Sequence, residues 1–240
     1  SGTIDENYSG KAFVRVKGKE QKVTTKANDG GTPFQYKEHK TTLFKGAVSV
    51  RDGYFESDFV VPLDLTPDYG KGKMNYLADN NSVAQGANTS YTVGGTSDNV
   101  LDDEEGPEIE MYMNDKDFVS GGITNENPVF CAELTDESGI NISGSGLGHD
   151  LTAIIDGDVS EKIILNDYYQ AEEDSYKEGK LEYQFSSLEK GSHTLKLEAW
   201  DVNNNLSTSS IEFKVTGSDD LKLDHVLNYP NPFTESTQFY

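Results

Sequence analysis

The clearest pattern in the chain lies in residues 191–215, where apolar and polar residues alternate on both sides of the polar segment 201–205. The apolar members are Leu195, Leu197, Ala199, Ile211, Phe213 and Val215. Alternation with a period of two is typical of strands with one buried face, and Asn and Asp favour tight turns. We therefore predict an antiparallel hairpin that turns at residues 201–205.

Trp200, the chain's single tryptophan, is out of phase with Leu195 and Leu197 in this hairpin. Either a loop covers that face of the hairpin or the indole is exposed. An exposed indole could stack on sugar rings, whereas covering a sheet face is the commoner use of an aromatic side chain. Trp200 is therefore a candidate binding residue with a structural alternative.

Residues 107–216 contain five more short alternating stretches before the hairpin. They are centred on residues 109–113, 130–134, 151–155, 163–165 and 181–185. Seven strands in about 110 residues, with frequent turns, predict an immunoglobulin-like β-sandwich. The Cys and Trp landmarks of antibody domains are absent from the sequence, so we predict the architecture alone.

Residues 3–98 read as a first β-sandwich of about six or seven strands. The best-defined part is residues 45–62, where Asp52-Gly53 separates two alternating segments, the second predicted to run from Phe55 to Val61. Asp-Gly favours the positive φ angles of a tight hairpin turn. The predicted fold class is all-β, with two consecutive β-sandwich domains and a short extended C-terminal tail.

Charge divides the chain in two. Of the net charge of −22, residues 1–98 contribute nothing, with 12 basic and 12 acidic residues, and residues 99–240 contribute all of it. The shift predicts a domain boundary near residue 99, with residues 99–106 as an acidic linker. The acidity excludes nucleic acid as a partner, because phosphate contacts need basic side chains.

Several acidic turns could hold Ca²⁺, which takes oxygen ligands. The weak candidates are Asp201 with Asn203 in the hairpin turn and Asp136 in an earlier turn, and the run Asp102–Glu105 is another. Turn formation and a solvated linker are the simpler readings. We predict no cofactor, with Ca²⁺ as the alternative.

The sequence does not place a complete set of catalytic residues together. Cys131, the single cysteine, lies in a strand pattern, and none of the four histidines is placed beside it by the sequence. A nucleophilic thiol needs a nearby base, so Cys131 is predicted to be structural. The chain has no apolar run of about 18 residues, so no membrane span is predicted.

The C-terminal tail carries a recognisable motif, followed by Thr234 and Thr237. Its residues are Asn228, Tyr229, Pro230, Asn231, Pro232 and Phe233. It resembles the opening of the C-terminal sorting domain of type IX secretion cargo. The two prolines preclude a helix, so we expect residues 217–240 to be a linker and the first strand of a truncated sorting-type domain.

Other segments extend the resemblance: residues 106–115, 136–141, 146–150, 165–169 and 193–204, and more thinly 50–55 and 61–65. They resemble the region downstream of the peptidase domain in the gingipain-like (C25) cysteine peptidases that act as type IX secretion sortases. The resemblance implies an exported parent at the cell surface and outer membrane, which removes the sorting signal of cargo and attaches the cargo to lipopolysaccharide. The family's catalytic His and Cys lie upstream, so no catalytic residue is carried over.

Two functions follow as expectations. The first is a non-catalytic structural and interaction module that positions the peptidase relative to its outer-membrane docking domain. Its partners would be the upstream peptidase domain in cis and an outer-membrane component of the secretion system, reached through the C-terminal domain. The second is a calcium- or carbohydrate-binding adhesive module of a secreted surface protein.

Overall fold

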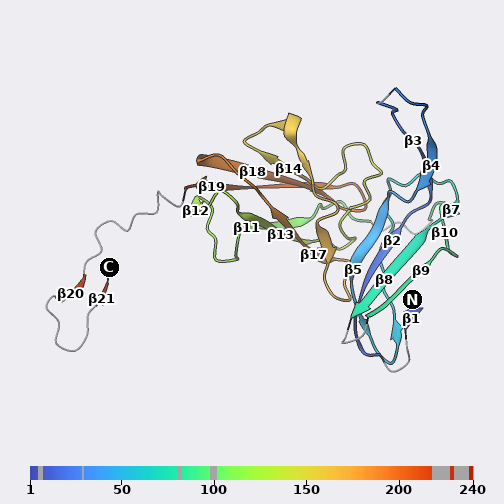
Figure 1. The fold of residues 1–240 in the computed structure, drawn as a ribbon. Coiled ribbons are helices and arrows are strands. Elements are labelled where there is room, and N and C mark those ends of the chain that lie inside the picture. Colours follow the sequence, from blue (N-terminus) through green and yellow to red (C-terminus); the bar gives the residue numbers. More distant parts are fainter. Residues whose placement is uncertain are drawn as a thin grey trace.

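The computed structural model describes residues 1–4, 8–28, 30–79, 83–97 and 102–217, and the backbone of 228–229 and 238–239. This part consists of strands, turns and irregular loops (Figure 1), with one 3₁₀ helix, η1 (Val159–Glu161). The predicted all-β fold class is confirmed. No helix in the described ranges has the length and apolar character needed to cross a membrane.

The largest sheet has eight strands and takes them from both halves of the sequence. In spatial order they are β11 (Glu108–Met113), β13 (Val129–Thr135), β17 (Glu178–Gln184), β16 (Tyr169–Ala171), β5 (Thr42–Val50), β2 (Gly10–Lys17), β8 (Lys73–Asp79) and β9 (Val83–Asn88). All neighbours are antiparallel except β16 and β5, which pair in parallel at Ala171 and Gly46. This one pairing joins the two halves into a continuous sheet.

A second, five-stranded sheet belongs to the second half alone. Its order is β12 (Gly122–Thr124), β19 (Leu206–Val215), β18 (Gly191–Trp200), β14 (Thr152–Ile155) and β15 (Ile163–Ile164). Together with β11, β13, β17 and β16 it forms two layers with the strand order of an immunoglobulin-like sandwich. All seven predicted strands are present, and the short strands β12 and β16 are additional.

The predicted hairpin forms the centre of this sandwich. β18 and β19 are paired from Gly191–Val215 to Trp200–Leu206, and Leu195, Leu197 and Ala199 are fully buried. Burial of three apolar side chains on one face accounts for the period-two pattern. In the turn, Asn204 has a φ of 72°, the left-handed angle for which Asn is suited.

In the first half, the Asp52-Gly53 turn is confirmed, with φ angles of 48° and 73°. The strand predicted from Phe55 to Val61 is wrong, because β6 (Tyr54–Phe55) ends at once. The chain leaves the sheet there, so that Phe59 stacks on Phe44 with ring centroids 5.5 Å apart. This half also contains two small sheets, in which β1 (Gly2–Thr3) pairs with β6 and β7 (Gly70–Lys71) pairs with β10 (Thr92–Val93).

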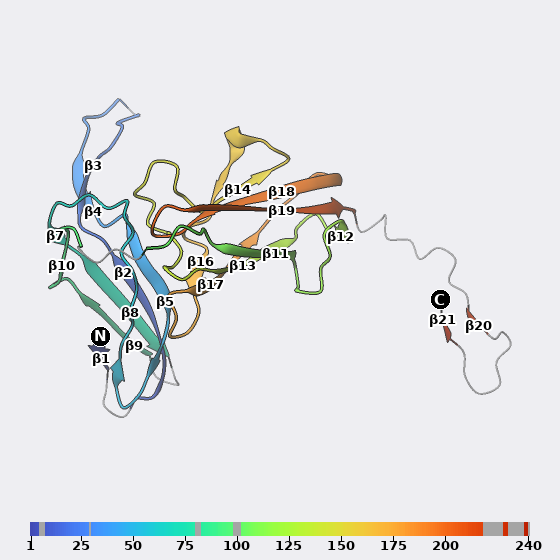
Figure 2. The ribbon, with the colours of Figure 1, turned by 180° about the vertical axis from the view of Figure 1, so that it is seen from behind.

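A hairpin of β3 (Gln21–Thr24) and β4 (Gln35–Glu38) projects from the first half, as Figure 2 shows from behind. Most buried apolar residues of both halves nevertheless belong to one contiguous cluster. The predicted boundaries at residues 99 and 107 stay a prediction, since the sheet runs through both halves.

In the tail, only the pairing of β20 (Asn228–Tyr229) with β21 (Gln238–Phe239) is described, and residues 230–233 of the motif lie outside the described residues.

Candidate functional site

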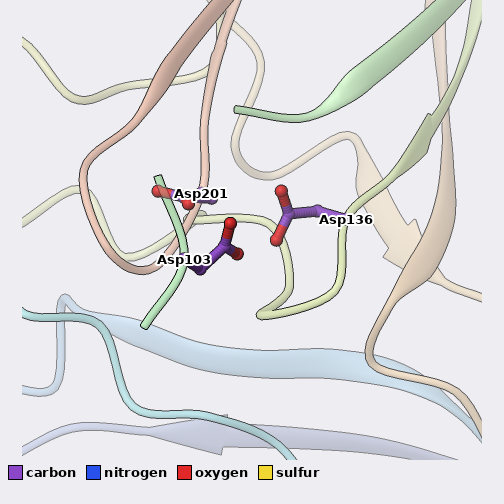
Figure 3. A group of neighbouring side chains, drawn as sticks. All are labelled: Asp103, Asp136 and Asp201. Carbon is purple, nitrogen blue, oxygen red and sulfur yellow. The ribbon is translucent and has the colours of Figure 1, made fainter. Parts of the chain in front are cut away.

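Three aspartates from distant parts of the sequence converge beside the junction of the two halves (Figure 3). Asp103 comes from the acidic linker, Asp136 follows β13 and Asp201 begins the turn after β18. One carboxylate oxygen from each lies within 4.8 Å of the others. Figure 3 shows the carboxylates of Asp103 and Asp136 pointing toward each other.

Burial sets the electrostatics of this aspartate cluster (Asp103, Asp136 and Asp201). Asp201 is fully buried and Asp136 is 7% exposed. Burial raises the pKa of both carboxyl groups, and the charge of Asp103 raises the pKa of Asp201 further. Asp201 likewise raises the pKa of Asp136. Each ionised carboxylate therefore makes its neighbour harder to ionise.

Local hydrogen bonds hold two of the three side chains. Asp136 Oδ1 accepts the backbone N–H groups of Ser138 and Gly139, each at 2.8 Å, and the Ser138 hydroxyl at 2.7 Å. Asp201 Oδ1 accepts the Asn205 N–H at 2.6 Å, and its Oδ2 accepts the Asn205 amide at 2.8 Å. These bonds close two turns and fix both carboxylates without adding a positive charge.

Asp103 is held less completely. Its Oδ1 accepts the Glu105 N–H at 3.1 Å, while its Oδ2 is buried and has no hydrogen-bond partner. The Asn205 amide donates to the Asp103 carbonyl at 2.8 Å, which ties the linker to the β18–β19 turn. A buried carboxylate oxygen without a donor is costly unless a proton or a cation satisfies it.

A hollow of about 710 Å³ leads to Asp103 and Asp136. Its lining has no basic side chain, and all but two of its residues are acidic: Asp102, Asp103, Glu104, Glu105, Gly106, Glu108, Thr135, Asp136 and Glu137. Carboxylate oxygens are ligands that Ca²⁺ prefers. The aspartate cluster can therefore either share protons or hold a divalent cation that the hollow attracts.

The sequence predicted part of this cluster. The structure brings Asp136 and Asp201 together, while Asn203 acts on Asp201 through a backbone hydrogen bond and is not one of the three grouped residues. Asp103 lies in the acidic run Asp102–Glu105, which the sequence offers as a linker and as a weaker calcium candidate without singling out one residue. The fold, by placing that run against two turns, selects one residue from it.

Trp200 is half-buried, and a loop covers part of its face. The His149 ring lies against the indole with centroids 4.2 Å apart. His149 Nδ1 lies 2.9 Å from Asp64 Oδ1, and Asp64 Oδ2 accepts the Asn141 amide at 2.8 Å. Asp64 belongs to the first half, so these contacts form a polar latch (Asp64, Asn141, His149) between the halves. Trp200 stays a candidate binding residue, with His149 against its indole ring.

Cys131 lies in β13, with its neighbours Tyr112 and Glu182 on the adjacent strands. Its thiol is buried, and burial together with the nearby carboxylates Glu182, Asp115 and Glu133 raises its pKa to about 11. A thiol with such a pKa is almost wholly protonated at neutral pH. Since the thiolate is the nucleophile, Cys131 is not activated for covalent catalysis.

No family model matches the chain, and no curated protein matches it. The solved structure of dimeric latent PorU from Porphyromonas gingivalis is similar, with 33% identity over 98% of this chain and a TM-score of 0.48. The chain spans 22% of the length of that PorU chain.

Proposed function

We propose that the chain is a non-catalytic structural and interaction module of a cell-surface type IX secretion sortase. In this role it positions an upstream cysteine peptidase domain in cis relative to an outer-membrane docking domain that follows the tail motif. The motif at residues 228–233 and the 33% identity to PorU support the family context. The buried, protonated thiol of Cys131 supports a role without catalysis.

The observation that carries the positioning role is the join between β16 and β5. Around the Ala171–Gly46 pair, the loop after β16 holds β5: the Ser49 N–H donates to Asp174 Oδ1 at 2.7 Å, and the Asp174 N–H donates to the Ala47 carbonyl at 3.1 Å. A further hydrogen bond between the halves runs from the Leu63 N–H to the Val202 carbonyl, at 2.9 Å. Backbone hydrogen bonds between two halves resist bending, which a spacer between two working domains requires.

Two assays test this function. The purified 240-residue chain is expected to leave a sorting-signal peptide uncut, with no difference between the wild type and Cys131→Ala. In a parent protein with an active peptidase domain, Gly46→Val is expected to leave turnover of free sorting-signal peptide unchanged and to reduce processing of cargo at the membrane. Turnover by the isolated chain that depends on Cys131 would overturn the proposal, and so would equal loss of both activities.

A second candidate function, Ca²⁺ binding, rests on the unpartnered Oδ2 of Asp103 facing two buried carboxylates. Bound Ca²⁺ would tie the linker to two turns of the immunoglobulin-like half and so stiffen the module. Titration calorimetry of the metal-free chain tests it, with heat expected from Ca²⁺ and none after Asp201→Asn. The carbohydrate alternative has less support, because the His149 ring lies against the Trp200 indole.

A further inference from the structure

The outer face of the first-half strands carries a hollow of about 750 Å³ with an unusual lining. It contains two cations and no carboxylate, in a chain with 42 acidic residues. The lining residues that matter here, which we call the basic face, are Phe13, Arg15, Lys45, Asn75, Leu77, Gln85 and Gln170. This is the reverse of the acidic hollow beside the aspartate cluster.

Strand register builds the basic face from two adjacent rows. Phe13 of β2 lies opposite Leu77 of β8, and the two side chains are 48% and 43% exposed. One step along, Arg15 lies between Lys45 of β5 and Asn75 of β8. Because side chains on one face of paired strands are neighbours, an apolar pair lies directly beside a cationic row.

The positive charge of this row is not neutralised. Within the described residues, Arg15, Lys45 and the adjacent Lys17 form no ion pair. Burial and then the charge of Arg15 lower the pKa of Lys17 and of Lys45. The charge of Asp167, joined at Lys17 by that of Glu38, only partly opposes this effect. The lysine ammonium groups donate instead to uncharged oxygens, namely the carbonyls of Lys40 and Asp167 and the Thr42 hydroxyl.

We propose that the basic face binds an acidic peptide segment that carries an apolar side chain. Carboxylates of the segment would pair with Arg15 and Lys45, where the guanidinium can hold a carboxylate by two hydrogen bonds. The amides of Asn75, Gln85 and Gln170 offer both donors and acceptors to a peptide backbone. The exposed pair Phe13 and Leu77 would receive the apolar side chain.

Two features favour an acidic peptide over other anionic partners. Leu77, half of the apolar pair, is an aliphatic side chain that suits a hydrophobic residue better than a sugar ring, whereas the Phe13 ring suits either. The chain as a whole has a net charge of −22, all of it from residues 99–240, so the second half repels acidic segments. The basic face is thus a local attractive site on a repelling surface, an arrangement that gives specificity of location.

The test uses the 240-residue chain and a fluorescent peptide of Glu-Glu-Leu repeats, with a Gln-Gln-Leu peptide as the neutral probe. Arg15→Gln with Lys45→Gln is expected to weaken binding about tenfold or more. Lys162→Gln with Lys214→Gln changes the net charge equally on the second half and is expected to leave binding unchanged. Phe13→Ser with Leu77→Ser keeps the charges and is expected to weaken binding severalfold. Far-UV circular dichroism verifies that each variant is folded.

Each other outcome contradicts the proposal. If the Arg15→Gln/Lys45→Gln variant and the Lys162→Gln/Lys214→Gln variant weaken binding equally, binding reflects net charge and not this face. If polygalacturonate binds more tightly than the acidic peptide, and the Arg15→Gln/Lys45→Gln variant loses this binding, the occupant is a glycan. Self-association that the Arg15/Lys45 variant abolishes, without peptide binding, makes the occupant a second copy of the chain.

Discussion

Gly46 of β5 pairs with Ala171 of β16, and a Cβ atom added at Gly46 would lie 3.0 Å from the Ala171 Cβ and 2.8 Å from the Phe44 ring. The two residues are 125 positions apart in the sequence. The close backbone approach that joins the halves therefore depends on the absence of a side chain at one position.

Substitution at this pair is expected to loosen the junction. Gly46→Val should destabilise the chain by about 1 to 3 kcal/mol, because the added methyl groups overpack the contact. Gly46→Ala should cost less, and Ala171→Gly should offset part of that cost by removing one clashing atom. Urea unfolding of the two single variants and the double variant measures this coupling, and strict additivity of their effects would contradict the contact.

The polar latch offers a second test, with the single tryptophan as its reporter. Asp64→Ala removes the acceptor of the Asn141 amide and the partner of His149, and is expected to cost about 1 to 3 kcal/mol. Because His149 lies on Trp200, release of the loop should also shift the Trp200 emission.

His193→Ala supplies the control for that experiment. His193 also pairs with an aspartate, Asp156, at 2.7 Å, but it stacks on Phe213 rather than on the tryptophan. Its loss should leave the Trp200 emission unchanged. Equal spectra for wild type and Asp64→Ala would show that the latch does not hold the loop.

The aspartate cluster predicts a distinctive dependence on pH. In the metal-free chain, the raised pKa values of Asp136 and Asp201 mean that the folded state binds protons more tightly than the unfolded state. Their contribution to stability is fully present below the ordinary carboxyl pKa and is lost as pH rises through the raised values. We expect Asp201→Asn to remove part of this loss, seen as a smaller fall in Tm with rising pH.

Calcium should reverse that trend, since it replaces the protons and favours ionised carboxylates. At 100-fold excess over its dissociation constant, a ligand adds about 2.7 kcal/mol to stability, and the gain should grow with pH. Asp115→Asn, which alters a carboxylate outside the aspartate cluster that accepts the Asp117 N–H, is the control and should keep the gain. A Tm that Ca²⁺ leaves unchanged at neutral pH would exclude the metal.

Cys131 gives the simplest prediction. With its thiol buried and its pKa raised to about 11, alkylation of the native chain at neutral pH should be slower than that of the unfolded chain by about two orders of magnitude or more. Iodoacetamide labelling followed by mass spectrometry compares the two states. Rapid labelling of the native chain would place the thiol in an accessible, activated environment.

The sequence predicted what depends on local pattern. The alternation at Leu195, Leu197 and Ala199 reports a buried sheet face, and Asp52-Gly53 reports a turn, because both effects act within a few residues. The β16–β5 pairing leaves no such pattern: β16 has three residues, and strand pairing uses backbone groups that every residue carries.

The aspartate cluster shows the same limit. Asp136 and Asp201 stood out as turn residues with oxygen ligands, but turns that are 65 residues apart meet only through the fold. Within the run Asp102–Glu105, the Asn205 amide donates to the carbonyl of Asp103, and such a contact cannot be read from composition. Sequence therefore supplied the ligand type, and tertiary structure supplied the grouping.

We propose that strand pairing makes the two halves one rigid spacer. Pulsed electron paramagnetic resonance measures it most directly, with spin labels at Lys71→Cys and Lys214→Cys in a Cys131→Ala chain. We predict a single narrow distance distribution that broadens when Gly46→Val is added. A broad distribution in the chain without Gly46→Val would contradict the claim.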